Sequence, residues 1–593
     1  MASSDFRLPS RDDEDSSDTR SFSSKRSRHV SLQSRVDSLA AESMWEEDGA
    51  KDAVPDIPAI YAQDRLRERS TSSLLEPLDG TRARWPTPVD GYSKAESYQR
   101  TSSPTIPPDP YQPLRITPFH EFLFIGVTVM AQFMALAGLG QALAPEDIIA
   151  EGLNVDNPGQ KAWFTAGYSL TVGTFILISG RIGDILGHKR MFVFGYFFLG
   201  VWSGFAGFSA YLGRQVFFDV CRAMQGIGAA MLAPNALALL GRAYPPGMKK
   251  NLVFSLFGAM APWGFVFGAL FGSIFSELAW WPWTFWTYGI AAWTLSALAL
   301  LVVPKALNHE AQFVTQAGRP GMDWTGSALG VAGLVLVNVA WNNGPLYGWS
   351  TPHVYFILII GLMSLMAFVY VEARALSPLL PVKFLNGTVT YTMALVAIGW
   401  GSFGIWVFYS WRFLMEIRGQ SPLTVSAEYT PALICGLLAA GATGFMLTHT
   451  PVSFVIMIAM VAFFVGNLIG AFQPVHQVYW AQMFVSILIM PFGMDMSFPA
   501  STIVLSNQMP PEHQGLAASL VNTIVNYSIS IALGIAGTVE VSVTNRGTTF
   551  EDTVWGIQCA RYTGVGLAGF GVLLGALFFG RTMMKEGWKV MEH

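Results

Sequence analysis

The chain has 593 residues, of which 52% are hydrophobic and 13% are charged, and its formal net charge at pH 7 is −4. Soluble proteins carry about 25% charged residues, so this composition excludes an ordinary soluble protein and favours a chain embedded in a lipid bilayer. Three scattered cysteines, Cys221, Cys435 and Cys559, are too few for a disulfide framework or a zinc site. We expect no metal, no cofactor and no nucleic-acid partner.

Residues 1–115 are rich in Ser, Arg, Asp and Pro and lack the apolar run of a signal peptide. Because this segment has little apolar surface to bury, we predict a disordered cytoplasmic tail.

Apolar runs long enough to cross a bilayer follow one another through the rest of the chain. About 20 helical residues cover the roughly 30 Å of hydrocarbon. The predicted spans lie near residues 119–143, 162–180, 191–212, 215–241, 251–277, 284–304, 325–342, 354–373, 390–414, 425–447, 452–472, 478–506, 515–538 and 562–582. The sequence therefore predicts an all-α membrane protein with about 14 transmembrane helices.

Lysine and arginine residues gather in alternate loops, and cytoplasmic loops of membrane proteins carry such an excess. If the first span runs outward from the cytoplasm, these loops and the C-terminal tail all fall on the cytoplasmic side. Their basic residues are Arg181, Lys189, Arg190, Arg242, Lys249, Lys250, Lys305, Arg319, Arg374, Lys383, Arg581, Lys585 and Lys589. Both termini are therefore predicted to be cytoplasmic, as an even number of spans requires.

The loop between the second and third spans is short, charged and rich in glycine. Its glycines let the chain reverse and let neighbouring helices approach closely, and its acid can cap a helix N-terminus and hold one conformation closed. We interpret the loop as a gate formed by Gly180, Gly183, Asp184, Gly187, Lys189 and Arg190. The alternative is a loop that only sets the orientation in the membrane.

Arg222 stands inside the fourth span, where an arginine is costly and should face a cavity or a partner. Asp219 precedes it by one helical turn and could form an ion pair with it. We assign both residues to a charged transport path. The alternative is a structural ion pair near the outer interface.

Gly264, Gly268 and Gly272 recur at four-residue intervals in the fifth span. Small residues at this spacing let helices pack closely and slide. We predict a packing face that takes part in a conformational switch, and an ordinary packing face is the alternative.

An internal repeat relates the fourth and fifth spans to the twelfth and thirteenth. Gly228, Pro234, Pro245 and Pro246 recur as Gly493, Pro499, Pro510 and Pro511, always 265 residues later. Duplicated halves with a site at their interface are typical of secondary transporters. We predict six-helix halves at 116–305 and 386–583, two inserted helices with cytoplasmic linkers at 306–385, and a cytoplasmic C-terminal tail at 584–593.

Asp495 lies within the twelfth span, between Pro491 and Pro499. An acid in a transmembrane segment is costly without a role, and a buried carboxylate can take up and release a proton during transport. We predict that Asp495 couples transport to protons. The alternative is an acid satisfied by backbone groups at a helix break.

The loop pattern G-x-x-x-D-x-x-G-x-K-R, which begins at Gly180, resembles the cytoplasmic loop signature of the major facilitator superfamily. The string R-x-x-Q-G-x-G-A-A from Arg222 resembles the fourth-helix motif of its antiporters. With 14 spans, the chain resembles the fungal drug:proton antiporter family, and the stretches 135–141, 493–499 and 522–528 resemble its aminotriazole-resistance and boron-exporter branch. The resemblance implies the major facilitator fold and proton-coupled export.

Two positions depart from the wider family. Ala269 replaces the proline of the antiporters' fifth-helix motif, and Leu136 stands where many drug exporters have an acid. We therefore expect no proton site in the first helix.

Taken together, these patterns predict a proton-coupled secondary transporter, not an enzyme, that exports a small toxic compound, drug or metabolite by alternating access. Low-affinity uptake of a small solute such as ammonium and a non-transporting membrane sensor or receptor are the alternatives. The residues predicted to give polar contacts in the substrate cavity are Gln141, Trp400, Asn522 and Asn526. Hydrogen bonding between helices is the alternative role for these four.

The expected partners are the lipid bilayer, a small-molecule substrate and protons. We expect a monomer in the plasma membrane, with the vacuolar membrane as the alternative. The inserted seventh and eighth spans are expected to pack outside the two halves and to carry no transport residue.

Overall fold

The computed structural model describes residues 116–588 except for gaps at 156–157, 162, 246–247, 306, 308–321, 376–378, 380–385, 509–513 and 545–548. Within this part of the chain all regular secondary structure is helical, and 14 helices are long and apolar enough to cross a membrane. The prediction of an all-α membrane protein with 14 spans is confirmed. The predicted tail at 1–115 and most of the linkers that flank the inserted helices lie outside the described residues.

The spanning helices form a first group of six, an inserted pair and a second group of six. The first group is α2 (Pro118–Leu143), α5 (Trp163–Leu186), α6 (His188–Leu212), α7 (Gln215–Ala243), α8 (Met248–Leu278) and α9 (Pro282–Val302). The inserted pair is α10 (Trp324–Tyr347) and α11 (Pro352–Glu372). The second group is α12 (Gly387–Arg412), α14 (Pro431–His449), α15 (Val452–Ala471), α16 (Gln482–Asn507), α17 (Gln514–Val543) and α18 (Phe550–Glu586).

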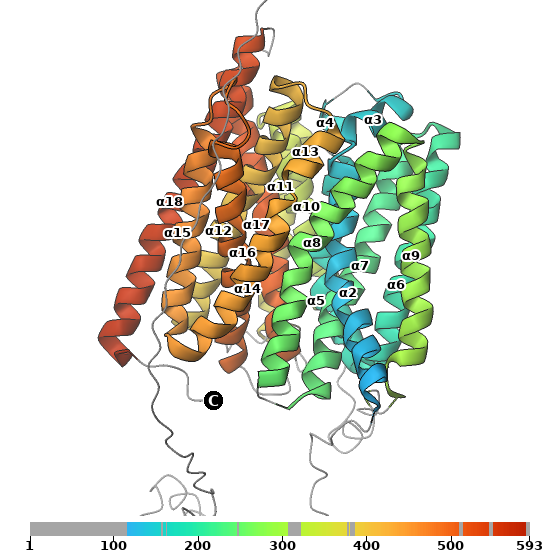
Figure 1. Ribbon diagram of the computed structural model, residues 1–593, viewed down its shortest axis with the longest axis vertical. Coiled ribbons are helices and arrows are strands. Elements are labelled where there is room, and N and C mark those ends of the chain that lie inside the picture. The colour runs from blue at the N-terminus through green and yellow to red at the C-terminus, as the bar shows by residue number, and fades with distance from the viewer. Residues whose placement is uncertain are drawn as a thin grey trace, which may run out of the picture. The chain divides into compact units, whose positions relative to one another are not determined.

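Short helices lie between some of the spans. These are α3 (Glu146–Gly152), α4 (Pro158–Lys161) and α13 (Pro422–Glu428), and a π-helical turn, η3 (Phe413–Ile417), extends α12. The labels α3, α4 and α13 gather at the upper end of the bundle in Figure 1. We call this the α3 end, and the opposite end, where α5 turns into α6, the α5–α6 end.

Side-chain caps fix where several spans begin. The side chains of Thr117, Asp323, Asn386 and Thr549 accept hydrogen bonds from backbone N–H groups in the first turns of α2, α10, α12 and α18. Such caps satisfy donors that the helix itself leaves unpaired, which matters most where little water is present. Proline occupies the first turn of α2, α9 and α11, where its missing N–H costs nothing.

The apolar core follows the division into two groups. One cluster of buried side chains is formed mainly by the first group and a larger one mainly by the second. The inserted helix α10 packs against α11, α17 and α5, whereas only Val354, Gly361 and Glu372 are buried on α11. A long apolar helix with so little protein around it is suited to lipid contact.

The internal repeat falls on matching helices. Gly228 and Pro234 lie in α7, and Gly493 and Pro499 lie in α16. Helix α8 follows α7 in the first copy, and α17 follows α16 in the second. Pro246, Pro510 and Pro511 lie outside the described residues.

The glycines of the fifth span form the contact between α8 and α2. A Cβ atom on Gly264, Gly268 or Gly272 would overlap backbone atoms of α2, and for Gly268 the obstructing atom is the carbonyl oxygen of Ala137. The two backbones therefore touch directly, as the spacing predicts. A role of this face in a conformational switch remains a prediction.

This contact can be tested by adding a single methyl group. We expect Gly268→Ala to lower the free energy of unfolding by about 1–3 kcal/mol, because the Cβ atom forces α2 and α8 apart. Thermal unfolding of the purified protein in detergent measures the effect. Gly258→Ala in the same helix is the matched control, since a Cβ atom there meets nothing within 4 Å. Equal melting temperatures for the two variants would show that the contact does not limit stability.

Candidate functional site

A cavity of about 1070 Å³ lies between the two groups of helices. Its wall comes from both groups and from the inserted helix α10. Toward the α3 end it reaches Asp147, Lys161 and Glu416. Small-molecule pockets are typically about 300–1,000 Å³, so this cavity can hold a drug-sized molecule.

The two groups of helices touch at the α5–α6 end. A Cβ atom on Gly180 of α5 would lie 3.3 Å from Oγ of Ser519 on α17. Deeper in the bundle, a Cβ atom on Gly173 would lie 3.0 Å from Cβ of Asn526. The contact between α5 and α17 therefore separates the cavity from the α5–α6 end.

Helix α8 joins the two groups along the other side of the cavity. The indole N–H of Trp263 donates to the carbonyl oxygen of Leu433 at 3.1 Å. Near the α3 end, the backbone N–H of Leu423 donates to Oε1 of Glu277 at 2.6 Å. These bonds tie α8 to α14 and α13.

Asp495 lies in the wall of the cavity on α16 and is only 6% exposed. Its Oδ2 atom is buried and has no hydrogen-bond partner among the described residues, and none of their cations lies within ion-pair distance of it. A Cβ atom on Gly436 of α14 would lie 3.0 Å from this oxygen and 2.9 Å from Pro262 of α8. The carboxylate thus sits where α16 and α14 meet α8, so it can respond both to the cavity and to the junction between the two groups.

Three of the four predicted polar cavity residues line the wall: Trp400, Asn522 and Asn526. The indole N–H of Trp400 donates to Oγ of Ser497 at 3.1 Å. The amide nitrogens of the two asparagines donate to carbonyls of their own helix, Asn526 to Asn522 at 2.9 Å. Gln141 is 2% exposed and is not part of this wall.

Arg222 is buried completely but does not line the cavity. Its guanidinium donates to the carbonyl oxygens of Phe164 and Gly138, both at 2.7 Å, and to Oε1 of Gln225 at 2.6 Å. It also lies over the ring of Tyr168, 4.7 Å from the centroid. Arg222 therefore joins α7 to α2 and α5.

The expected ion pair between Arg222 and Asp219 is absent from the described structure, which corrects that part of the sequence interpretation. The carboxylate of Asp219 accepts from Gln215 at 3.2 Å instead. The reason is geometric: one turn of helix separates the two residues, but the guanidinium extends toward two carbonyls of neighbouring helices and the side chain of Gln225, which together offer it three directed hydrogen bonds.

In the Gly180–Arg190 loop, Asp184 interacts with the side chains of neighbouring residues. Its carboxylate lies 3.2 Å from Nε2 of His188 and 3.7 Å from Arg242. His188 is buried, and its Nδ1 lies 2.7 Å from Oδ1 of Asn235 on α7. These contacts stay within the first group of helices.

The other loop residues have distinct surroundings. Gly187 has φ of 99°, a conformation that glycine adopts without strain. Lys189 is 8% exposed and donates to the carbonyls of Leu300, at 2.9 Å, and Val303, at the C-terminus of α9 where a cation is favourable. Arg190 is exposed, and a Cβ atom on Gly183 would overlap the Asn235 side chain. Gly180 approaches Ser519 of the second group, and a gating role for the loop remains a prediction.

The charged cluster near the α3 end was missed by the sequence interpretation. Arg412 forms paired hydrogen bonds with Glu416, at 2.6 and 2.9 Å, and with Glu540, at 2.9 and 3.0 Å. The hydroxyl of Tyr409 donates to Glu540 at 2.8 Å. An arginine at the end of the ninth predicted span was the available signal, but its partner Glu540 lies beyond the predicted end of the thirteenth.

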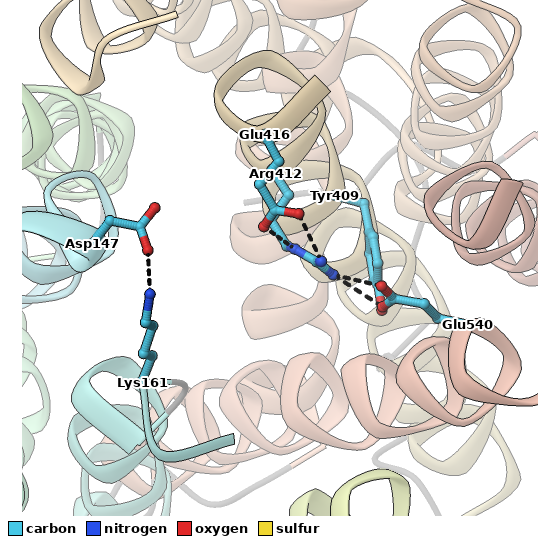
Figure 2. Close-up of polar contacts among 6 residues, drawn as sticks. All are labelled: Asp147, Lys161, Tyr409, Arg412, Glu416 and Glu540. Carbon is cyan, nitrogen blue, oxygen red and sulfur yellow. Dashed lines mark hydrogen bonds and ion pairs between the residues drawn. The ribbon is translucent and has the colours of Figure 1, made fainter. Parts of the chain in front are cut away.

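Figure 2 shows this cluster opposite a second ion pair, in which Lys161 donates to Asp147 at 2.8 Å. All six labelled residues line the cavity, and Tyr409 also packs into the apolar core. The two sets come from different parts of the chain, one near the first group of helices and the other in the second. The two sets face one another across the cavity.

The charges of the wall are predominantly negative. The lining contains the acids Glu146, Asp147, Glu416, Asp495 and Glu540 and the bases Lys161 and Arg412. Both bases contact acids, which leaves the wall with more negative than positive charge. Trp400, Trp406 and Trp411 are among its aromatic residues, so the wall combines acids with π faces, the chemistry that attracts cations. No group of three or more His, Cys, Asp or Glu residues that could hold a metal occurs among the described residues.

A sequence profile of the Major Facilitator Superfamily matches residues 123–402. The chain is 52% identical over 472 residues to a protein of Saccharomyces cerevisiae named low affinity ammonium transporter. The matched region covers 80% of this chain and 91% of that protein. It is 44% identical over 460 residues to efflux pump terJ of Aspergillus terreus, with 77% and 88% covered. It is also 38% identical over 472 residues to the aminotriazole resistance protein of Saccharomyces cerevisiae, with 79% and 85% covered.

Among solved structures, the fold is similar to that of the POT family transporter PepTSo. The TM-score is 0.55 at 14% sequence identity, and the match covers 79% of this chain and 99% of that one. The human organic anion transporter MFSD10 gives a TM-score of 0.51 at 11% identity, with 77% and 98% covered. At these identities the likeness concerns the fold.

Proposed function

This chain belongs to the major facilitator superfamily of membrane transporters, and from that premise we propose that it is a proton-coupled secondary transporter. Its substrate is a small toxic compound, drug or metabolite, and the direction of transport is export. The relatives named as efflux pumps and as a resistance protein support this direction. The size of the cavity supports a substrate of drug size.

The observation that carries the proposal is the carboxylate of Asp495. It lies in the cavity wall, is 6% exposed and has no cation partner among the described residues. Keeping an ionised carboxylate buried and unpaired costs several kcal/mol, so proton binding competes with access of water or a cationic substrate. A group in this position can exchange a proton for substrate when the cavity changes sides.

We place the α5–α6 end in the cytoplasm, because the described basic residues that are predicted to be cytoplasmic, among them Lys189, Arg242 and Lys249, lie at that end. In this orientation the cavity reaches toward the outside, and α5 and α17 close it from the cytoplasm. Opening the α5–α17 contact while closing the α3 end would give the second state of alternating access. The charged sets of Figure 2 are the groups that would approach one another in that state. We expect the plasma membrane as the location.

Flux across a membrane tests the proposal. The purified protein is reconstituted in liposomes with an imposed pH gradient, and boric acid, aminotriazole, ammonium and several bulky drugs are screened with the gradient in both directions. We expect exchange of at least one solute against protons. Flux that is indifferent to the gradient would contradict proton coupling, and no flux of any solute would favour the sensor alternative.

A second candidate function is low-affinity uptake of ammonium. The relative named low affinity ammonium transporter, 52% identical to this chain, favours it, and so does the excess of acids in the cavity wall. Uptake predicts that ammonium enters the liposomes down its own concentration gradient. It also predicts that an inward flow of protons does not expel ammonium. The same liposomes distinguish the two directions.

Glu146 of α3 supplies a pH-dependent element at the cavity mouth. Burial, and then the neighbouring charge of Asp147, raise the pKa of this carboxyl from 4.5 to about 7. The folded protein thus holds this proton more tightly than the unfolded chain, so its contribution to stability is present at low pH and is lost as pH rises from about 4.5 to 7. As pH rises over this interval, we expect the melting temperature of Glu146→Gln to increase relative to that of the wild type. Glu151→Gln, exposed on the same helix, should run parallel to the wild type, and a parallel course for Glu146→Gln would contradict the assignment.

A further inference from the structure

The inserted helix α10, which was expected to pack outside the two halves, contacts α17 and α5 and lines part of the cavity. The indole N–H of Trp341 donates to the carbonyl oxygen of Ile531 at 2.8 Å. A Cβ atom on Gly534 would overlap the Trp341 ring, so α17 has a glycine where the indole approaches. Side-chain hydrogen bonds and small residues are the two means by which membrane helices associate. The two helices therefore form one unit.

A cluster of polar side chains completes this contact at the cavity. Nδ2 of Asn338 donates to Oγ of Ser530 at 2.6 Å. Nδ2 of Asn342, one turn further along α10, donates to the same hydroxyl at 3.0 Å and to the carbonyl and side-chain oxygens of Asn338 at 2.9 Å. Asn342 and Ser530 both line the cavity.

The nitrogen and the oxygen of the Asn342 amide have different surroundings. Its nitrogen is occupied by Asn338 and Ser530, whereas its Oδ1 has no hydrogen-bond partner among the described residues. The side chain is half-buried and lines the cavity, so this oxygen is the part of the amide that remains to bind a ligand. An amide oxygen accepts hydrogen bonds and cannot donate them.

We propose that Asn342 contacts the transported molecule and that its Oδ1 accepts a hydrogen bond from an N–H or O–H group of that molecule. The proposal rests on the function proposed above and narrows its substrate class to molecules that carry such a donor. It agrees with the rest of the wall, where Glu146 and Asp495 are further acceptors. The bonds from α10 to α17 hold the amide at the cavity, so the inserted helix supplies a specificity-determining residue.

The matched control comes from the same pair of helices. The indole N–H of Trp349 donates to Oγ1 of Thr538 at 3.0 Å, and neither residue lines the cavity. Trp349→Phe therefore removes a hydrogen bond between α10 and α17 without altering the cavity wall. Asn342→Leu removes both the acceptor oxygen and the N–H donors, whereas Asn342→Asp removes the N–H donors and keeps an acceptor oxygen.

Binding to the detergent-purified protein is measured as the rise in melting temperature that a ligand causes. Three donor-bearing probes are used: ammonium, aminotriazole and boric acid. Tetraphenylphosphonium, a cation without N–H or O–H groups, serves as the donor-free probe. We expect Asn342→Leu to weaken binding of a donor-bearing probe about fivefold, the change that follows loss of one neutral hydrogen bond. Asn342→Asp and Trp349→Phe should bind that probe at least as well as the wild type. Tetraphenylphosphonium should bind Asn342→Leu and Trp349→Phe as it binds the wild type.

Equal weakening by Asn342→Leu and Trp349→Phe would overturn the proposal, because the amide would then act only by joining the helices. Unchanged binding in Asn342→Leu, or no binding of any donor-bearing probe to the wild type, would overturn it as well. If Asn342→Leu does not fold, weak binding by the folded Asn342→Asp variant contradicts the proposal. Binding needs no pH gradient, so failure of proton coupling in liposomes is distinguished from failure of this contact.

Discussion

Replacing Asp495 by asparagine is expected to reduce proton-driven transport about a hundredfold, the lower end of what a positioned proton-transfer group contributes. Asparagine has the volume of the acid but can neither take up nor release a proton. The carboxylate is 6% exposed and has no cation partner among the described residues, so removing its charge should leave the fold intact. Transport driven by a pH gradient in liposomes gives the rate, and size-exclusion chromatography verifies folding.

The control for Asp495→Asn removes an acid elsewhere. Glu551 is exposed at the start of α18, so Glu551→Gln should transport as the wild type does. Exchange of substrate across liposomes without a gradient should persist in Asp495→Asn, because it needs no net proton movement. Normal pH-dependent flux in Asp495→Asn would remove this residue from the coupling mechanism.

Arg222→Lys is expected to lower both stability and transport. The guanidinium reaches the carbonyl oxygens of Phe164 and Gly138 on two different helices, and a compact ammonium group cannot reproduce that fork. Each buried carbonyl left without a donor costs about 1–3 kcal/mol. Thermal unfolding in detergent measures this loss directly. Transport should fall because α2 and α5 carry part of the cavity wall.

Arg214→Lys provides the comparison, since Arg214 is exposed at the start of the same helix. It should match the wild type in melting temperature and flux. Wild-type behaviour of Arg222→Lys would mean that only a positive charge is needed at this position. A stable variant with impaired flux would instead favour the original assignment of Arg222 to the transport path.

The spans could be predicted because each depends on local composition. A run of apolar residues needs no partner in the sequence to identify it, and basic loops mark one side without knowledge of packing. Asp495 could be predicted for the same reason, since its cost arises from depth in the membrane. Its contact with Gly436, which also lies against Pro262, could not be predicted, because those residues lie on two other helices.

Contacts between segments far apart in the chain could not be predicted from the sequence. The partners of Arg222 at Phe164 and Gly138 are backbone carbonyls, which every residue has, so no residue type points to them. Arg412 and Glu540 are 128 residues apart and meet only through the packing of α12 against α17. For the inserted helix a signal was present: Asn338 and Asn342 recur at one-turn spacing in an apolar span.

The contact between α2 and α8 has a mechanical consequence. Gly268 leaves no space for even a methyl group against Ala137, so the two helices cannot shear past each other without unpacking. The same helix α8 holds α14 through Trp263 and reaches α13 through Glu277. A stiff pair attached in this way behaves as a lever: a tilt that parts the helices at one end of the bundle brings them together at the other. Under the alternating access proposed above, this rigidity would make access to the two sides of the membrane mutually exclusive.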